Sequence, residues 1–261
     1  MRALFTAATG MEAQQVRIDA VANNLANVST TGFKKSRAEF QDLFYETLQA
    51  PGAQSSTGNT VPTGVQIGHG VRFAAVSRIF GQGDRVNTGH ELDLAIEGDG
   101  FFQVQKPDGE TVYTRDGTFK RDRDGNVVTN HGYPLIPNIQ IPTDTIQLTI
   151  LADGTVSALQ AGQQTPTDLG RIELARFVNP SGLRALGNNL FVPTEASGDP
   201  QTGNPDEEGF GAVSQGFLEM SNVNVAEELV NMILSQRAFE VNSRVMQTGD
   251  QMLQTAASIV R

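Results

Sequence analysis

The sequence contains no cysteine and no tryptophan, and only three of its 261 residues are histidine. Without cysteine the chain can form neither disulfides nor thiolate nucleophiles, and it cannot bind a metal through sulfur. The histidines, His69, His90 and His131, are far apart in the sequence and belong to no HExxH motif. Ordinary surface positions are therefore favoured over metal ligands or general bases. We expect neither a metal site nor a cofactor.

Long apolar runs are also missing. No uncharged apolar stretch approaches the roughly 18 to 20 residues that a membrane-spanning helix needs. Residues 1–10 have no continuous hydrophobic segment followed by a cleavage site. We therefore expect no membrane insertion and no cleaved secretory signal.

Basic residues are outnumbered by acidic ones. Nineteen Lys and Arg against 29 Asp and Glu give a formal net charge of −10. This charge repels phosphate backbones unless a basic patch is segregated, and only Lys34, Lys35 and Arg37 cluster. We therefore expect nucleic acid not to be a partner.

Motifs for catalysis or ligand binding are incomplete. The stretch from Asp122 to Asn126 resembles the start of a calcium loop, but Tyr133 stands where a bidentate Glu is needed. Two Gly-x-Gly sequences, at residues 68–70 and 81–83, lack the third glycine and the following helix of a dinucleotide site. Gly-x-Ser-x-Gly is absent. The sequence predicts no catalytic residue and gives no specific support for an enzyme.

The sequence does contain a seven-residue apolar repeat near its C-terminal end. Asn224 is a suitable N-cap, and Glu227 and Glu228 place negative charge at the positive end of a helix dipole. A helix over residues 225–260 would be about 54 Å long at about 1.5 Å per residue, longer than a small domain is wide. We therefore expect neighbouring molecules to complete its apolar seam. The repeat consists of Val225, Met232, Phe239, Met246, Leu253 and Val260.

A matching repeat lies near the N-terminal end, where a helix is predicted from about residue 3 to residue 26. Turn-forming residues at 27–32 should end it. Both helices join the middle of the chain by their inner ends, so they must be antiparallel if they pack together. An ordinary helix bundle is the alternative, but no third long helical pattern exists to complete it. The N-terminal repeat consists of Leu4, Met11, Ile18 and Leu25.

The middle of the chain is predicted to be mostly β-structure. Residues 33–48 suggest an extended or partly helical arm, and residues 50–64 have the composition of a flexible loop. From residue 70 to 193 short β-branched and aromatic runs alternate with turns, including five Asp-Gly pairs suited to tight hairpins. Residues 195–211 are acidic and rich in Gly and Pro, which predicts a solvated loop.

These patterns together predict an α+β fold with long antiparallel, coiled-coil-like N- and C-terminal helices flanking a central all-β domain. We assign residues 1–32 with 221–261 to a terminal helical self-assembly domain. Residues 33–69 with 212–220 form an extended connecting arm in this division, and residues 70–211 form a β-rich outer domain.

Three blocks of sequence resemble the bacterial flagellar rod and hook family. Residues 22–35, ANNLANVSTTGFKK, are similar to its N-terminal signature, and residues 98–133 are similar to its β-domain core through GDGFFQV, YTRDGTF and DGNVVTNHGY. Residues 221–253 resemble its C-terminal helix, although Phe239 stands where the family often has Tyr. Within the family, the length and the PGAQSS sequence in residues 45–62 are most similar to the distal rod branch.

The resemblance implies a non-enzymatic subunit that the flagellar type III export apparatus exports without a cleaved signal. The implied product is an open helical homopolymer, a rigid drive shaft that spans the periplasm and transmits torque from the motor to the hook. Proximal rod proteins, hook or hook-side axial proteins and the outer ring bushing are the implied partners. A rod-stiffening segment is implied at Tyr45, Leu48, Pro51, Val61 and Pro62.

Two alternatives remain at this stage. One is a hook or proximal rod subunit of the same family. The other is a soluble β-domain binding module on a two-helix stalk that closes into a small oligomer.

Overall fold

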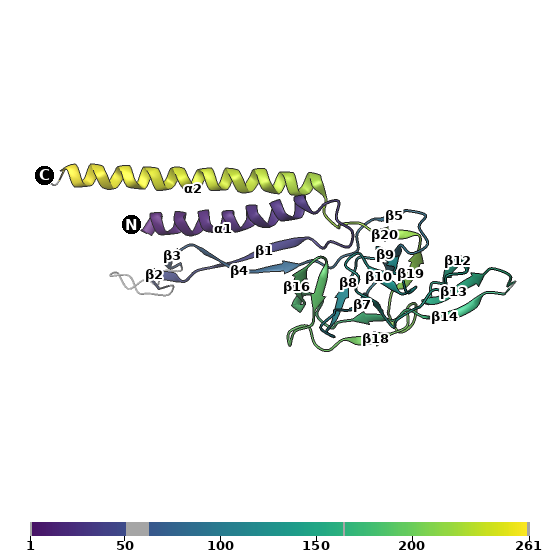
Figure 1. Cartoon of the computed structure of the whole chain (residues 1–261). Coiled ribbons are helices and arrows are strands. Elements are labelled where there is room, and N and C mark those ends of the chain that lie inside the picture. Colours follow the sequence, from purple (N-terminus) through teal and green to yellow (C-terminus); the bar gives the residue numbers. More distant parts are fainter. Residues whose placement is uncertain (1, 51–62, 164, 260–261) are drawn as a thin grey trace. The chain divides into compact units, whose positions relative to one another are not determined.

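The structure is a computed structural model that describes residues 2–50, 63–163 and 165–259 (Figure 1). The chain divides into two compact units. The first unit comprises residues 1–25, 36–77 and 224–261, and the second comprises residues 26–35 and 78–223.

The first unit is built on two long helices, α1 (Arg2–Ala26) and α2 (Val225–Ile259). Asn224 caps α2, because its Oδ1 accepts hydrogen bonds from the backbone N–H groups of Ala226 and Glu227 at 3.0 and 3.3 Å. The beginning of α1 and the end of α2 lie at the same end of the helix pair (Figure 1). The predicted antiparallel terminal helices are therefore confirmed.

Glycines allow the two helices to approach closely. A Cβ on Gly10 of α1 would lie 2.8 Å from Nδ2 of Asn242, and a Cβ on Gly249 of α2 would lie 2.6 Å from Cδ2 of Leu4. Since the contact partners run in opposite directions along the two helices, these contacts also set the antiparallel register.

Two strand pairs accompany α1 in the first unit. β1 (Ser36–Asp42) pairs with β4 (Val71–Arg78), and β2 (Tyr45–Gln49) pairs antiparallel with β3 (Val65–Gly68). The Asn24 side chain exchanges two 2.8 Å hydrogen bonds with the backbone of Ser36. Residues 33–48 thus form an extended arm rather than a partly helical one. The flexible loop predicted at 50–64 lies largely outside the described residues.

The second unit contains a seven-stranded antiparallel sheet, as expected for a β domain. Its order is β16-β17-β8-β7-β15-β18, with β11 also paired to β7. The strands are β7 (Phe101–Gln105), β8 (Thr111–Thr114), β11 (Leu135–Ile136), β15 (Leu174–Arg176), β16 (Arg184–Gly187), β17 (Leu190–Val192) and β18 (Gln201–Gly203).

Smaller antiparallel pairings and a short 3₁₀ helix, η1 (Pro180–Gly182), complete the second unit. β5 (Arg85–Asn87) pairs with β20 (Phe217–Glu219), and β6 (Leu94–Glu97) pairs with β19 (Ala212–Gln215). Residues 212–220, which we expected in the connecting arm, are thus part of this unit. The remaining strands are β9 (Phe119–Arg121) with β10 (Val127–Thr129), and β12 (Thr145–Ile150), β13 (Thr155–Gln160) and β14 (Thr167–Arg171) in one sheet.

Turn chemistry explains several of these hairpins. Gly109, Gly125 and Gly154, each preceded by Asp, have φ of +87°, +87° and +82° and lie in the β7–β8, β9–β10 and β12–β13 turns. Only glycine adopts such angles freely. The hairpin prediction for these three Asp-Gly pairs is therefore confirmed. The solvated loop predicted at 195–211 was wrong in part, because residues 201–203 form β18 and pair with β15.

Successive side chains of the central strands point to opposite faces of the sheet, so these strands contribute to two hydrophobic cores. Phe102 and Val104 of β7 face the larger core with Val112 and Leu174, whereas Phe101 belongs to a second, aromatic cluster. That aromatic cluster consists of Phe101, Tyr113, Ala175, Phe177, Leu183 and Phe191, with Phe80 packed against it. Neither α1 nor α2, the α-helices in the described ranges, combines the length and apolar character needed to cross a membrane.

Candidate functional site

The side of α2 that packs on α1 is small and polar rather than apolar. Glu228, Ser235, Asn242 and Gly249 recur every seven residues along this side, and the last two contact α1. Glu228 and Ser235 are 4% and 1% exposed. On α1 the buried residues are Ala7, Ala13, Val21 and Asn24. The side of α2 that faces α1 is therefore not the apolar repeat that the sequence emphasised, although Leu4 of the α1 repeat does lie against Gly249.

The predicted apolar repeat of α2 lies beside this seam and remains half open to solvent. Val225, Phe239 and Leu253 are between 36% and 42% exposed, and Met232 and Met246 are half-buried. Val260 lies outside the described residues. The four repeat residues of α1, which are Leu4, Met11, Ile18 and Leu25, are also half-buried.

A second, more exposed apolar row lies on α2. Its members lie on neither the seam nor the predicted repeat, and they are 43% to 69% exposed. The spacing from 245 to 252 is visible in the sequence as part of a second seven-residue ladder beside the repeat that begins at Val225, whereas the spacing from 234 to 241 was missed. We call this set the outer row: Val230, Leu234, Val241, Val245 and Met252.

The residues that follow α1 are fixed on the second unit by side chains from distant strands. The hydroxyl of Thr31 donates to Oδ1 of Asp116 at 2.9 Å, and Nδ2 of Asn189 donates to the carbonyl of Thr31 at 2.8 Å. Gly32 has φ +67°, and a Cβ there would lie 2.6 Å from the backbone nitrogen of Asp116. Position 32 therefore requires glycine for two separate reasons.

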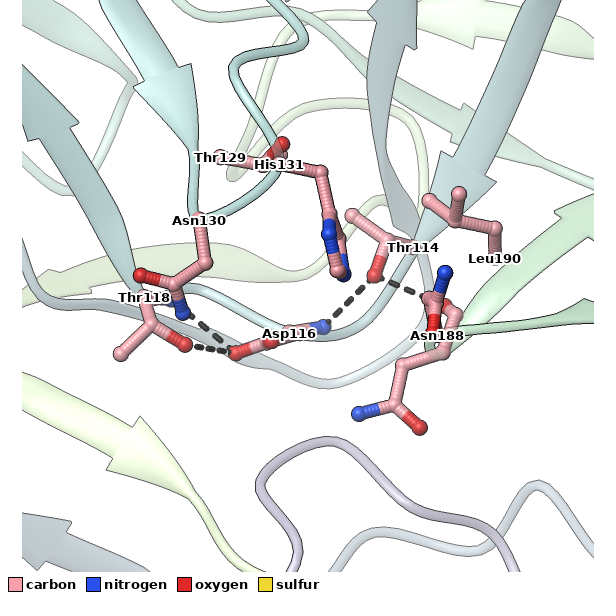
Figure 2. A pocket seen from close by; sticks show the side chains of 9 residues that line it. Thr114, Asp116, Thr118, Thr129, Asn130, His131, Asn188 and Leu190 are labelled. Carbon is pink, nitrogen blue, oxygen red and sulfur yellow. Dashed lines mark hydrogen bonds between the residues drawn. The ribbon is translucent and has the colours of Figure 1, made fainter.

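A polar cavity of about 100 Å³ lies beside this docked segment (Figure 2). Its walls carry Thr114, Asn130 and His131, and Asp116 forms part of its floor. Oδ1 of Asp116 is already bonded to Thr31 and Thr118, so this carboxylate serves the docked segment rather than a ligand. Among the described residues, no group of three or more His, Asp or Glu side chains is arranged to bind a metal ion.

Next to Thr31 lies a buried cluster of three charged side chains. Lys34 Nζ and Glu219 Oε1 are 2.6 Å apart, and Arg115 Nη1 lies 3.3 Å from Glu219 Oε2. The side chains of Lys34, Glu219 and Arg115 are 0%, 1% and 3% exposed. Burial lowers the pKa of Lys34, and the nearby Glu219 carboxylate opposes that shift. The cluster carries two positive charges and one negative charge away from water.

Hydrogen bonds around this cluster join the segment that follows α1 to the segment that precedes α2. The backbone N–H of Gly32 donates to the carbonyl of Glu219 at 2.8 Å, and the N–H of Lys35 donates to Oδ1 of Asn222 at 2.8 Å. Nδ2 of Asn222 donates in turn to the carbonyls of Ile79 and Gly81. Within the second unit, residues 32–35 and 219–222 are thus held side by side.

The predicted stiffening segment is only partly described. Tyr45 and Leu48 lie on β2 with exposed side chains, whereas Pro51, Val61 and Pro62 lie outside the described residues. Val65 and Ile67 on the paired strand β3 are exposed as well. A hydrogen bond to Asp42 raises the pKa of the Tyr45 phenol. The described part of this segment is a hairpin that exposes four apolar side chains, with no cover from the other described residues.

Three models of known protein families match parts of this chain. Residues 4–34 match the family model "Flagella basal body rod protein", and residues 214–259 match "Flagellar basal body rod FlgEFG protein C-terminal". Residues 95–158 match "Flagellar hook protein FlgE/F/G D1 domain". The matched ranges include both helices, the docked segment after α1 and the centre of the β domain.

Full-length similarity to individual proteins shows which branch of the rod and hook family this chain belongs to. The flagellar basal-body rod protein FlgG of Borreliella burgdorferi is 51% identical over 100% of this chain and 99% of its own. FlgG of Buchnera aphidicola subsp. Schizaphis graminum is 50% identical over 98% of both chains, and that of Bacillus subtilis is 39% identical over 100% of both. The chain belongs to the FlgG family of flagellar basal-body rod proteins. It is a distal rod subunit of the flagellar basal body, a structural protein and not an enzyme.

The family assignment confirms the distal rod prediction and removes both alternatives, the hook or proximal rod subunit and the soluble binding module. A solved hook protein, Helicobacter pylori FlgE2, is 17% identical, covers 71% of this chain and 43% of its own, and has a TM-score of 0.25.

Proposed function

We propose that copies of this chain assemble into the rod through the terminal helix pair. The outer row of α2 and the half-exposed repeats of α1 and α2 are the contact surface in this proposal. The observation that carries it is the arrangement of α2, which packs its small polar side on α1 and leaves apolar side chains of the outer row in solvent. Exposed apolar surface of this extent is typical of an interaction site.

Seven-residue spacing along both helices supports helix-to-helix contacts between copies. Residues seven apart return to the same side of a helix, so the outer row can pack along the whole length of a partner helix. A contact between two different surfaces of the same chain does not close on itself and produces an open helical polymer. The repeat residues Leu4, Met11, Ile18, Leu25, Val225, Met232, Phe239, Met246, Leu253 and Val260 belong to this proposed assembly surface.

Family membership supports a wider set of partners, which we also propose. The flagellar type III export apparatus delivers the chain, proximal rod proteins precede it in the axis, and hook or hook-side axial proteins follow it. The outer ring bushing surrounds the assembled shaft. In this proposal the rod is rigid and transmits torque from motor to hook, and the segment with Tyr45, Leu48, Pro51, Val61 and Pro62 stiffens it.

A substitution in the outer row tests the assembly surface. Leu234→Asp places a carboxylate where we expect an apolar contact, so rods should be absent from isolated basal bodies and cells should not swim. Gln251→Asp, at an exposed position that lies on neither the outer row nor the repeat, is the matched control and should leave rods and swimming intact. Normal rods built from Leu234→Asp chains would reject the proposed surface.

A further inference from the structure

Phe44 is an aromatic side chain that a well-held backbone presents to solvent. It lies between β1 and β2 of the first unit and is 89% exposed. The backbone on both sides is paired, because His69 N–H donates to the Phe44 carbonyl at 3.1 Å and Leu43 N–H donates to the Gly70 carbonyl at 2.9 Å. The ring therefore projects from an ordered arm and does not hang from a loose loop.

The second unit contains a pocket of about 170 Å³ that is lined by three phenylalanines and by the charged residues Asp99, Arg115 and Arg176. The Phe101 ring packs edge-to-face against Phe80 and Phe177, with centroids 5.5 and 5.7 Å apart. Val178, which is 80% exposed, lies on the rim of this pocket. An apolar cavity of about 150 Å³ in another protein admits a benzene ring, so this volume suits a phenyl side chain.

Arg115 gives the pocket a further preference for an aromatic ring. Its guanidinium lies 5.4 Å from the centroid of the Phe101 ring and lines the pocket. Its Nε is buried and has no hydrogen-bond partner among the described residues. A second ring entering the pocket would come near this cation, which favours the negative face of an aromatic ring.

We propose that Phe44 of one copy enters this pocket of a neighbouring copy. The inference rests on the proposed function, since it needs copies that assemble, and it adds a specific contact outside the helices. The projecting ring and the pocket are different surfaces carried by different units, so the contact is heterologous. Such a contact repeats from copy to copy without closing, as an open rod requires.

The absence of cysteine from the chain makes a cross-linking test specific. Chains carrying both Phe44→Cys and Val178→Cys should assemble and, when isolated basal bodies are treated with a short bis-maleimide, give a ladder of covalent multimers. Mixed rods from chains with one substitution each should give dimers and nothing larger. The matched control combines Phe44→Cys with Ile146→Cys, because Ile146 is an exposed apolar residue of the second unit outside the pocket. This control should give no ladder.

Two outcomes would overturn the contact. One is normal rods with no multimers from the Phe44→Cys, Val178→Cys pair, and the other is consumption of both thiols by cross-links within single copies. Failure of the proposed function looks different, because rods would then survive Leu234→Asp. As a second measurement, Phe44→Ala should raise the chain concentration needed for polymerisation at least about ten-fold, the equivalent of losing one buried phenyl group. An unchanged concentration would also reject the contact.

Discussion

Lys34 and Glu219 form a 2.6 Å ion pair between two fully buried side chains that are 185 residues apart in the sequence. Glu219 also accepts from Arg115 and from the N–H of Gly83 at 2.9 Å, so its carboxylate is the common partner of the cluster. Lys34 has a second acceptor in the carbonyl of Gly81 at 2.9 Å. One carboxylate thus holds the segment after α1 and the segment before α2 on the same part of the β domain.

Glu219→Gln is expected to destabilise the β domain strongly. The substitution removes the carboxylate that Lys34 and Arg115 contact directly, and breaking a buried pair in this way costs about 3 to 5 kcal/mol. Urea unfolding followed by a probe of the β domain measures this loss. Glu110→Gln, which breaks the exposed pair with Lys106, is the control and should change the free energy of unfolding by less than about 1 kcal/mol. Equal effects of the two changes would mean that the buried cluster contributes no more than a surface pair.

Gly32→Ala tests the docking of the segment after α1. A left-handed backbone costs an alanine about 1 to 2 kcal/mol, and the added Cβ also meets the Asp116 backbone, which we expect to cost about 1 to 3 kcal/mol more. Gly109→Ala is a close control, because Gly109 has φ +87° and no heavy atom of the described residues lies within 4 Å of its added Cβ. Unfolding free energies should therefore fall further for Gly32→Ala. The same loss in both variants would remove the steric part of the explanation.

Much of this fold could be predicted from local chemistry. The Asn224 cap, the two terminal helices and the Asp-Gly turns at Gly109, Gly125 and Gly154 each depend on neighbouring residues, and each was recognised correctly. The side of α2 that meets α1 could not be found in this way, because Ser235 and Gly249 carry no hydrophobic signal. The Lys34–Glu219 pair could not be predicted either, because no pattern in the neighbouring sequence shows that a lysine will be buried against a carboxylate 185 residues away.

The pH dependence of stability should include a contribution from Asp153. Its carboxylate accepts from Thr155 N–H at 3.0 Å, from Thr155 Oγ1 at 2.9 Å and from Arg171 Nη2 at 2.8 Å. These bonds, that from the Thr155 backbone most of all, lower the pKa of Asp153 from 3.8 to about 2. Because the folded pKa is depressed, the contribution is fully present above the unfolded pKa of about 4 and is lost as the pH falls through about 2. Asp153→Asn should therefore lower the urea midpoint at pH 7 and have a smaller effect at pH 2; an effect independent of pH would contradict this.

The helix pair should be weakly protected in the isolated chain. Oε1 of Gln14 and Oε2 of Glu228 are buried without a hydrogen-bond partner among the described residues, and the apolar side chains of the outer row are 43% to 69% exposed. Both features reduce the free energy that helix packing can gain against the entropy of ordering, about 1 to 2 kcal/mol per residue. Hydrogen exchange on dilute chains should therefore be fast in α2 and slow in β7 and β8. Strong protection of α2 in the monomer would show that the helices need no neighbour.

Deleting residues 49–62 should change the stiffness of the rod without preventing its assembly. The deletion joins Leu48 of β2 to Thr63, and only Thr63 and Gly64 then separate Leu48 from Val65 of β3. Two residues suffice for a tight hairpin, so the β2–β3 pairing of Tyr45 with Gly68 can persist. The helices are untouched, so export and polymerisation should continue, whereas the product should be curved or flexible.

The control replaces residues 51–60 with ten Gly and Ser residues and keeps the length. It should also give flexible rods if side chains in the segment make the stiffening contacts. Electron micrographs of isolated basal bodies measure the curvature, and deletion rods as straight as the unmodified ones would show that the segment is a passive loop.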